Sequence, residues 1–198
     1  NMKIFKIELA LFALMAVVSC KEVKKEASEA KEEVEELMDE AKSEMNEDET
    51  VIQFMLEPKS ESNVKGDVTF TEKNEEVSMV AMLSGLSEGE HAIHIHQTAD
   101  CSAADGSSTG GHWNPTNEPH GKWGATEGYH KGDIGNFTAD AEGNAKVEFS
   151  TDEWCIGCDD ENKNILGKGV IVHQGVDDYT SQPSGAAGAR VSCAGIIE

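Results

Sequence analysis

The sequence is poor in positive charge. It contains 16 lysines and arginines against 38 aspartates and glutamates, which gives a formal net charge of −22, and its single arginine is Arg190. Binding to nucleic acid requires a cationic surface, so this shortage argues against nucleic acid as a partner. The part of the chain after residue 50 contains 148 residues. This length is enough for one domain to bury a hydrophobic core.

A hydrophobic run long enough for a membrane-spanning helix is missing from the N-terminal region. Residues 9–18 are ten apolar residues in a row, whereas a spanning helix needs about 20. Lys3 and Lys6 precede the run, as in a signal peptide, and its end at Cys20 resembles a bacterial lipobox. We expect residues 1–19 to be a signal peptide and Cys20 to be lipidated, which would anchor the protein to a lipid membrane in the periplasm or cell envelope. The alternative is an ordinary signal peptide, and it also predicts secretion.

Residues 20–50 lack glycine, proline and aromatic residues. Residues 21–50 contain five lysines against thirteen acidic residues, and their apolar residues recur at spacings of three and four. This spacing is typical of a helix, but half of the apolar positions are alanine and would bury little surface. We expect an acidic helical or disordered spacer, with a weak coiled coil as the alternative.

From residue 51 to 198 the pattern changes to short alternating segments separated by polar turns, which predicts an all-β sandwich or barrel of seven or eight strands. The predicted strands are Val51–Leu56, Val64–Thr71, Val77–Leu83, His91–His96, Ile134–Thr138, Ala145–Phe149 and Gly169–His173. Two long polar segments, Gln97–Asp133 and Gln174–Cys193, interrupt the series. Loops of this length are uncommon unless they are functional, so we expect the chemistry there.

All seven histidines fall between positions 91 and 173. His94 and His96 are two residues apart in a predicted strand, so their side chains point to the same face. On its own, this pair fits a metal site and a pair of surface histidines equally well. His173, at the end of another predicted strand, could add a further imidazole. A site of three or four imidazoles suits copper, zinc or iron, and the ligand type does not choose between them.

The long segment 97–133 contains a second group of ligand-type side chains. His112, His120, His130 and Asp133 lie within it among glycines and prolines. Three imidazoles and a carboxylate are a suitable tetrahedral set for zinc, and metal bonds would order a loop that has little apolar core of its own. A surface loop that happens to contain histidines is the alternative.

Five blocks in this order resemble the copper/zinc superoxide dismutases, in particular their secreted bacterial branch. They are Gly89–His96, Gly111–Pro115, His130–Asn136, Val172–His173 and Gly188–Arg190. The resemblance covers essentially all of residues 51–198 and implies a Greek-key β-sandwich or flattened barrel of about eight antiparallel strands. It also implies an enzyme that converts two superoxide anions and two protons to hydrogen peroxide and dioxygen. A protein that binds or delivers copper without turnover is the alternative.

The resemblance implies a role for each ligand-type residue. His94, His96, His112 and His173 would bind copper, and His112, His120, His130 and Asp133 would bind zinc, so that His112 bridges the two metals. Arg190 would attract and orient superoxide, and Asp177 would link a copper ligand to a zinc ligand, although its neighbour Asp178 leaves this assignment open by one residue. His91 would pack beneath the site without binding metal.

Five cysteines are present. With Cys20 lipidated, four remain, and secretion favours their pairing. The resemblance implies a disulfide between Cys101 and Cys193. Cys155 and Cys158 form a CxxC pair outside the family pattern, for which a small disulfide, a redox dithiol and a soft-metal site are the alternatives; we expect the disulfide. The sequence does not determine whether the protein is a monomer or a homodimer.

Overall fold

The computed structural model describes residues 49–197. The predicted signal peptide, the lipidation site Cys20 and nearly all of the predicted spacer lie outside these residues. The first strand begins at Glu49, slightly before the expected domain start at Val51. Within the described part of the chain, no helix is long and apolar enough to span a membrane.

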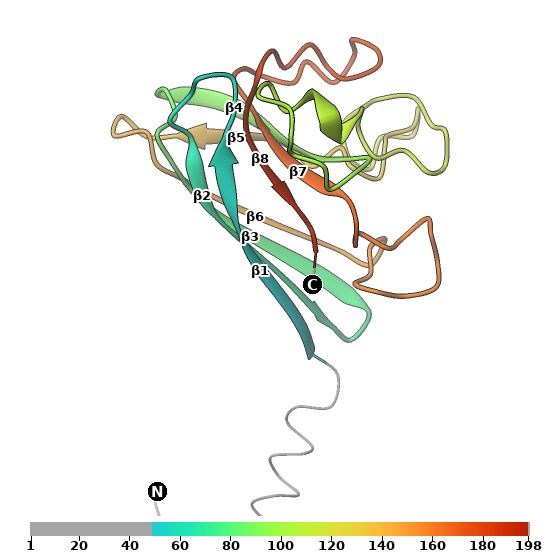
Figure 1. The fold of residues 1–198 in the computed structure, drawn as a ribbon. Coiled ribbons are helices and arrows are strands. Elements are labelled where there is room, and N and C mark those ends of the chain that lie inside the picture. Colours follow the sequence, from blue (N-terminus) through green and yellow to red (C-terminus); the bar gives the residue numbers. More distant parts are fainter. Residues whose placement is uncertain (1–48, 198) are drawn as a thin grey trace, which may run out of the picture. The chain divides into compact units, whose positions relative to one another are not determined.

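Eight antiparallel strands form one sheet in the order β5-β4-β7-β8-β1-β2-β3-β6 (Figure 1). The strands are β1 Glu49–Pro58, β2 Lys65–Lys73, β3 Glu76–Ser84, β4 Gly89–His96, β5 Gly135–Ala139, β6 Ala145–Thr151, β7 Gly169–His173 and β8 Arg190–Gly195. The described residues contain one short 3-10 helix, η1 Ser107–Thr109. The all-β prediction is therefore confirmed.

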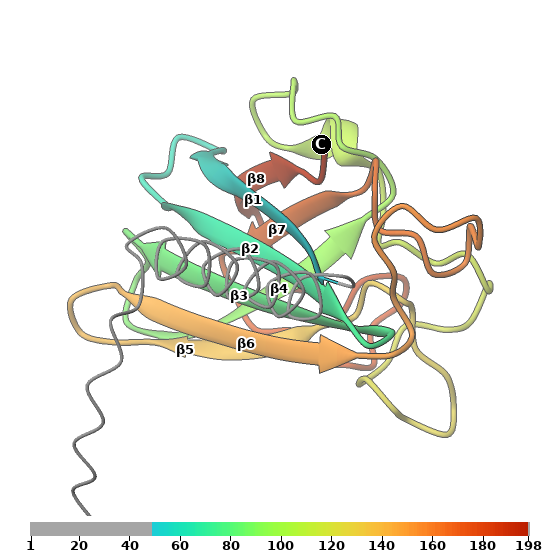
Figure 2. The ribbon, with the colours of Figure 1, turned by 90° about the horizontal axis from the view of Figure 1, so that it is seen from below.

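The sheet curls into a nearly closed barrel. Its two edge strands, β5 and β6, contact each other and run side by side in Figure 2. In β3 the alternation of apolar residues turns Val77, Met79, Ala81 and Leu83 into the interior, as the period of a strand requires. The interior is apolar, and Phe70 and Trp154 are among its largest fully buried side chains.

Strands β4 and β7 are buried on both faces. Ile93 and Ile95 of β4 pack in the barrel core, while His94 and His96 point to the opposite face. Strand β4 pairs with β7, and the end of β7 pairs with the start of β8 so that His173 lies opposite Arg190. The long segments 97–134 and 174–189 lie on this side of the barrel and cover the outer face (Figure 1).

One predicted boundary is wrong. The sequence pattern predicts a long irregular segment over Gln174–Cys193, but its last residues belong to β8, which starts at Arg190. The error arises because Arg190, Ser192 and Cys193 do not show the apolar alternation of a half-exposed strand. Val191, Ser192, Cys193 and Ala194 are all buried, since the strand is covered on both faces.

Candidate metal centre

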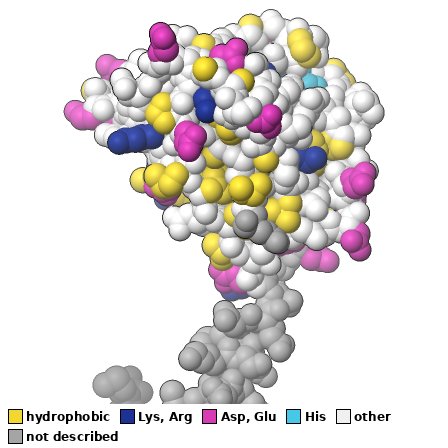
Figure 3. All heavy atoms as spheres, viewed as in Figure 1, with side chains coloured by type: hydrophobic (Ala, Val, Ile, Leu, Met, Phe, Trp, Pro, Cys, Tyr) yellow, Lys and Arg dark blue, Asp and Glu magenta, His cyan; other side chains and the backbone are white. Residues whose placement is uncertain are grey.

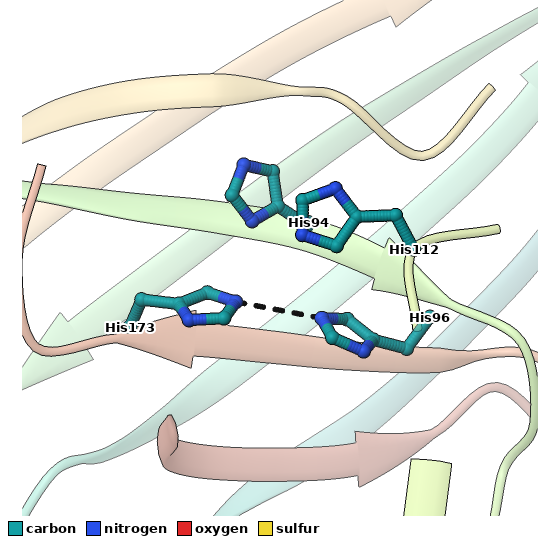
Figure 4. Close-up of side chains that lie close together, drawn as sticks. All are labelled: His94, His96, His112 and His173. Atoms are coloured by element: carbon teal, nitrogen blue, oxygen red, sulfur yellow. Dashed lines mark hydrogen bonds between the residues drawn. The ribbon is translucent and has the colours of Figure 1, made fainter. Parts of the chain in front are cut away.

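Four histidines from two strands and one loop converge on a single point. His94 and His96 extend from β4, His173 extends from the end of β7, and His112 reaches in from the covering loop (Figure 4). One ligand atom from each of the four lies within 4.8 Å of all the others. All four side chains are buried, so the cluster is shielded from bulk water. Figure 3 shows correspondingly little histidine surface on the face that it presents.

A second cluster shares one residue with the first. His112, His120, His130 and Asp133 also bring one ligand atom each within 4.8 Å of one another. Asp133 Oδ1 lies 2.8 Å from His112 Nδ1 and 3.3 Å from His130 Nδ1, and Asp133 Oδ2 lies 3.0 Å from His120 Nδ1. His112 therefore presents one ring nitrogen to each cluster.

The histidines of the first cluster are held through the nitrogen that faces away from its centre. His94 Nε2 donates to Asp177 Oδ2 at 2.8 Å, and His96 Nδ1 donates to the Gly110 carbonyl at 2.9 Å. Such outer hydrogen bonds fix the tautomer and orientation of metal-binding imidazoles. The inward Nε2 atoms of His96 and His173 face each other at 3.4 Å (Figure 4).

Four of the inward nitrogens have no hydrogen-bond partner although they are buried: His94 Nδ1, His112 Nε2, His120 Nδ1 and His130 Nδ1. His120 Nδ1 is close to Asp133 Oδ2, but it lacks the direction of a hydrogen bond. Buried polar atoms are nearly always paired, and an unmade hydrogen bond costs about 1–3 kcal/mol. Bound metal ions would satisfy these atoms. The residues therefore fit two metals, one in each cluster.

Asp177 forms a hydrogen bond with one histidine of each cluster. Its Oδ2 accepts from His94 Nε2 and its Oδ1 accepts from His120 Nε2 at 2.9 Å. Asp177 is buried, whereas its neighbour Asp178 is exposed and bonds to Ser181 and Thr180 in its own turn. The geometry thus distinguishes between the two aspartates that the sequence left open.

The electrostatics of the site favour neutral imidazoles at His96, His112 and His173. Burial and the neighbouring histidines hold the pKa of His96 and His173 well below the ordinary value. Burial also lowers the pKa of His112 to about 4, against the opposing effect of Asp133. Deprotonated imidazole is the form that binds metal, so this cluster is prepared for a cation.

Two carboxylates dominate the electrostatics of the second cluster: Asp133, which belongs to it, and Asp177, which bonds to His120 from outside. Burial acts to lower the pKa of His120, but the close carboxylate of Asp133 and the hydrogen bond to Asp177 outweigh it and raise that pKa to about 9. Burial acts to raise the pKa of both aspartates, but their histidine partners hold each pKa far below the usual value. Both carboxylates are therefore ionised over the physiological pH range.

Arg190 lies at the mouth of the first cluster. A pocket of about 420 Å³ is lined by Arg190 together with His96, His112 and His173. The guanidinium Nη1 donates to the Gly106 carbonyl at 2.8 Å and to Thr109 Oγ1 at 2.9 Å. A small anion that entered this pocket would meet both the guanidinium and the imidazoles.

Both cysteine pairs form disulfides, Cys101–Cys193 and Cys155–Cys158. The first ties the loop containing η1 to β8, the strand that begins at Arg190. His91 takes no part in either cluster: its Nδ1 bonds to the His173 carbonyl and its Nε2 to the Ser87 carbonyl.

Some residues that support the site could not be found from the sequence. The Gln182 side chain accepts a hydrogen bond from the backbone N–H of His120 at its Oε1 and donates one to the His120 carbonyl from its Nε2, both at 2.9 Å. Thr109 accepts a hydrogen bond from Arg190, which lies 81 positions later in the sequence. Neither residue belongs to a recognisable motif, since polar residues of these types are common in loops and their partners are distant along the chain.

The fold and the site define a class: an eight-stranded antiparallel β-barrel protein with two adjoining histidine-rich metal clusters. The family model described as "Copper/zinc superoxide dismutase (SODC)" matches residues 64–196. The chain belongs to this family, and its cofactors are copper and zinc.

Curated relatives carry the same family name. A superoxide dismutase [Cu-Zn] 2 from Mesembryanthemum crystallinum is 38% identical over 143 residues, covering 69% of this chain and 88% of the relative. The extracellular superoxide dismutase [Cu-Zn] of Drosophila melanogaster is 34% identical over 156 residues, covering 74% of this chain and 83% of the relative. The presence of an extracellular relative and of disulfides in this chain fits secretion.

Solved structures share the fold. A double mutant of a SOD-like protein from Bacillus subtilis has a TM-score of 0.66 and 29% identity over 74% of this chain and 97% of its own. The clock protein EA4 has a TM-score of 0.63 and 30% identity over 74% of this chain and 94% of its own. Proteins with names other than superoxide dismutase therefore also have this barrel.

Proposed function

We propose that this protein is a catalytic superoxide dismutase, in which His94, His96, His112 and His173 bind copper and His112, His120, His130 and Asp133 bind zinc. The observation that supports this most strongly is the position of His112. Its two ring nitrogens face two different ligand clusters, and neither cluster is complete without it. A chain that only stored one metal would not need this shared residue.

When bound, copper supplies the one-electron redox chemistry that oxidises one superoxide anion to dioxygen and reduces the next to hydrogen peroxide. The chain's own residues guide the substrate and its protons. Arg190 attracts the anion into the pocket and orients it. His112 can hold a proton at Nε2, the nitrogen that faces the first cluster, and release it to the reduced oxygen. Asp177 keeps His94 and His120 in their binding orientation.

The proposal is tested by the activity of histidine variants after loading with both metals. His96→Ala removes a residue of the first cluster only, so we expect this variant to lose dismutation while it retains zinc. His91→Gln is the matched control, because His91 is a buried β4 histidine that belongs to neither cluster, and it should keep its activity. Equal activity in His96→Ala and the wild type would contradict the copper assignment.

Asp177→Asn is expected to weaken the binding of both metals. It leaves the size of the side chain unchanged but removes the charge that orients His94 and His120, and loss of such outer partners typically costs about 10–100-fold in metal affinity. The measurement is an equilibrium competition with a chelator of known affinity. Asp178→Asn is the control, since Asp178 is exposed and does not contact a histidine. Equal affinities in the two variants would remove Asp177 from the site.

The second candidate function is copper binding or delivery without turnover. It is favoured by the structural similarity to proteins whose names do not describe them as dismutases. The complete second cluster and Arg190 favour the enzyme, because a copper carrier needs neither. Tight copper binding together with no acceleration of superoxide decay would identify the carrier.

We also propose that the chain is a secreted envelope lipoprotein of the bacterial branch of the family. Residues 1–19 would be a signal peptide, Cys20 the lipidated residue, residues 20–50 a spacer and residues 51–198 the dismutase domain. The supports are the hydrophobic run before Cys20 and the disulfides of the barrel. Mass spectrometry of the membrane fraction tests it: a diacylglycerol-modified Cys20 is expected, and an unmodified soluble chain starting elsewhere would contradict it.

A further inference from the structure

The segment after β6 contacts the residues on both sides of His130. The Tyr129 hydroxyl donates to Glu153 Oε1 at 2.6 Å, and the Lys131 ammonium group forms an ion pair with Glu153 Oε2. One carboxylate therefore holds both chain neighbours of a histidine in the second cluster.

The next residue, Trp154, fixes the backbone of the same stretch. Its indole N–H donates to the Lys131 carbonyl at 2.8 Å. Only 1% of Trp154 is exposed, and its ring packs against those of Phe149 and Trp123, with centroids 5.0 and 5.8 Å away. Because the barrel core immobilises the indole, the Lys131 carbonyl is held at a fixed position relative to the barrel.

The Cys155–Cys158 disulfide comes directly after Trp154 in the sequence. Cys155 is buried, its N–H donates to the Lys163 carbonyl, and its carbonyl accepts from the N–H of Ile165. The disulfide and these hydrogen bonds anchor the segment at its far end. Glu153 and Trp154 are thus held between β6 and a cross-linked turn, which limits the movement of their side chains.

We propose that Glu153–Cys158 is a brace that positions His130 and Asp133 for zinc, and that the Cys155–Cys158 disulfide stiffens this brace. The inference rests on the zinc assignment of the proposed function. Its physical basis is preorganisation: when the stretch around His130 is already fixed, binding zinc costs less conformational entropy. Glu153 and Trp154 act through the ligands, so they are positioning residues.

The energetics explain why the effect should appear at zinc rather than in overall stability. The side chains of Lys131 and Glu153 are 20% and 31% exposed, and partly exposed ion pairs of this kind contribute little net stability. A small loss of order around His130 nevertheless changes the ligand geometry, to which metal affinity is sensitive. Loss of the Cys155–Cys158 disulfide by substitution would then promote zinc release.

The test is the rate of zinc transfer from the loaded protein to a chromogenic chelator. Glu153→Gln and Trp154→Phe should release zinc about 10–100-fold faster than the wild type, and Cys155→Ala/Cys158→Ala severalfold faster. Cobalt(II) bound in place of zinc should show an altered visible spectrum in these variants, since that spectrum reports ligand geometry. Melting of each metal-free variant shows whether it folds.

Two matched controls separate positioning from general destabilisation. Glu161→Gln removes an exposed carboxylate from the same connection, and Phe54→Leu alters the aromatic packing of the core at Phe70 without touching Trp154 or the Lys131 carbonyl. Both should release zinc at the wild-type rate. Release rates within twofold of the wild type in all three brace variants, or equally fast release in the controls, would overturn the brace. Because zinc release does not depend on turnover, an inactive protein would refute the proposed function and leave this result intact.

Discussion

Removal of the Cys101–Cys193 disulfide, by Cys101→Ala/Cys193→Ala, is expected to lower the free energy of unfolding by about 4–5 kcal/mol. The bond joins residues 92 positions apart, so its loss greatly enlarges the conformational entropy of the unfolded chain. Alanine is chosen because Cys193 is fully buried and serine would bury an extra hydroxyl. Urea unfolding of the metal-free protein measures the change.

The control for this variant is Cys155→Ala/Cys158→Ala. Its disulfide spans a sequence separation of 3, for which the same chain-entropy relation gives about 2 kcal/mol. The long-range pair should therefore cost more than twice as much as the short one. A loss below about 1 kcal/mol for the Cys101–Cys193 pair would show that the disulfide does not constrain the unfolded state as expected.

Replacement of Arg190 by alanine is expected to lower the rate of dismutation by about ten- to a hundredfold, in line with the rate gains attributed to local electrostatic attraction. The chain as a whole is strongly negative, so the anionic substrate depends on the local positive charge in the pocket. The rate of the variant should also depend less on ionic strength, because the attraction that salt screens is gone. Rates are measured on fully loaded proteins over a series of salt concentrations.

Two variants define what the arginine contributes. Arg190→Lys keeps the charge but loses the planar fork that bonds to Gly106 and Thr109, so a partial rate is expected. Lys146→Ala removes one positive charge from the exposed face of β6, where Lys146 pairs with Glu148, and should leave the rate unchanged. A rate for Arg190→Ala within twofold of the wild type would exclude Arg190 from substrate guidance.

The fold could be predicted because its signals are local. The alternation of Val77, Met79, Ala81 and Leu83 is visible in the sequence and is also what places them in the core. Strand β8 was partly missed for the opposite reason: it is buried on both faces, so it shows no alternation. Where covering loops replace solvent on one face of a strand, the pattern that reveals the strand disappears.

The histidines of the site and their division into two groups could be recognised from residue type and spacing, but the sharing of His112 between the two clusters required the family resemblance. The residues alone offered His173 as a further imidazole but left its joining His94 and His96 open, since the three meet only when β7 pairs with β4. The residues that support the site could not be recognised from the sequence. Glu153 and Trp154 contact residues more than 20 positions away, and nothing in their local sequence indicates the partner.

The account is tested most directly by the decay of superoxide generated in a pulse, followed with catalytic amounts of the protein loaded with copper and zinc. Superoxide alone disappears in a second-order reaction. We predict that the loaded protein makes the decay first-order, with a rate proportional to bound copper, and that peroxide forms in the ratio of one molecule to two superoxide anions. Decay that remains second-order, in a protein shown to contain both metals, would contradict the assignment of this chain as a working superoxide dismutase.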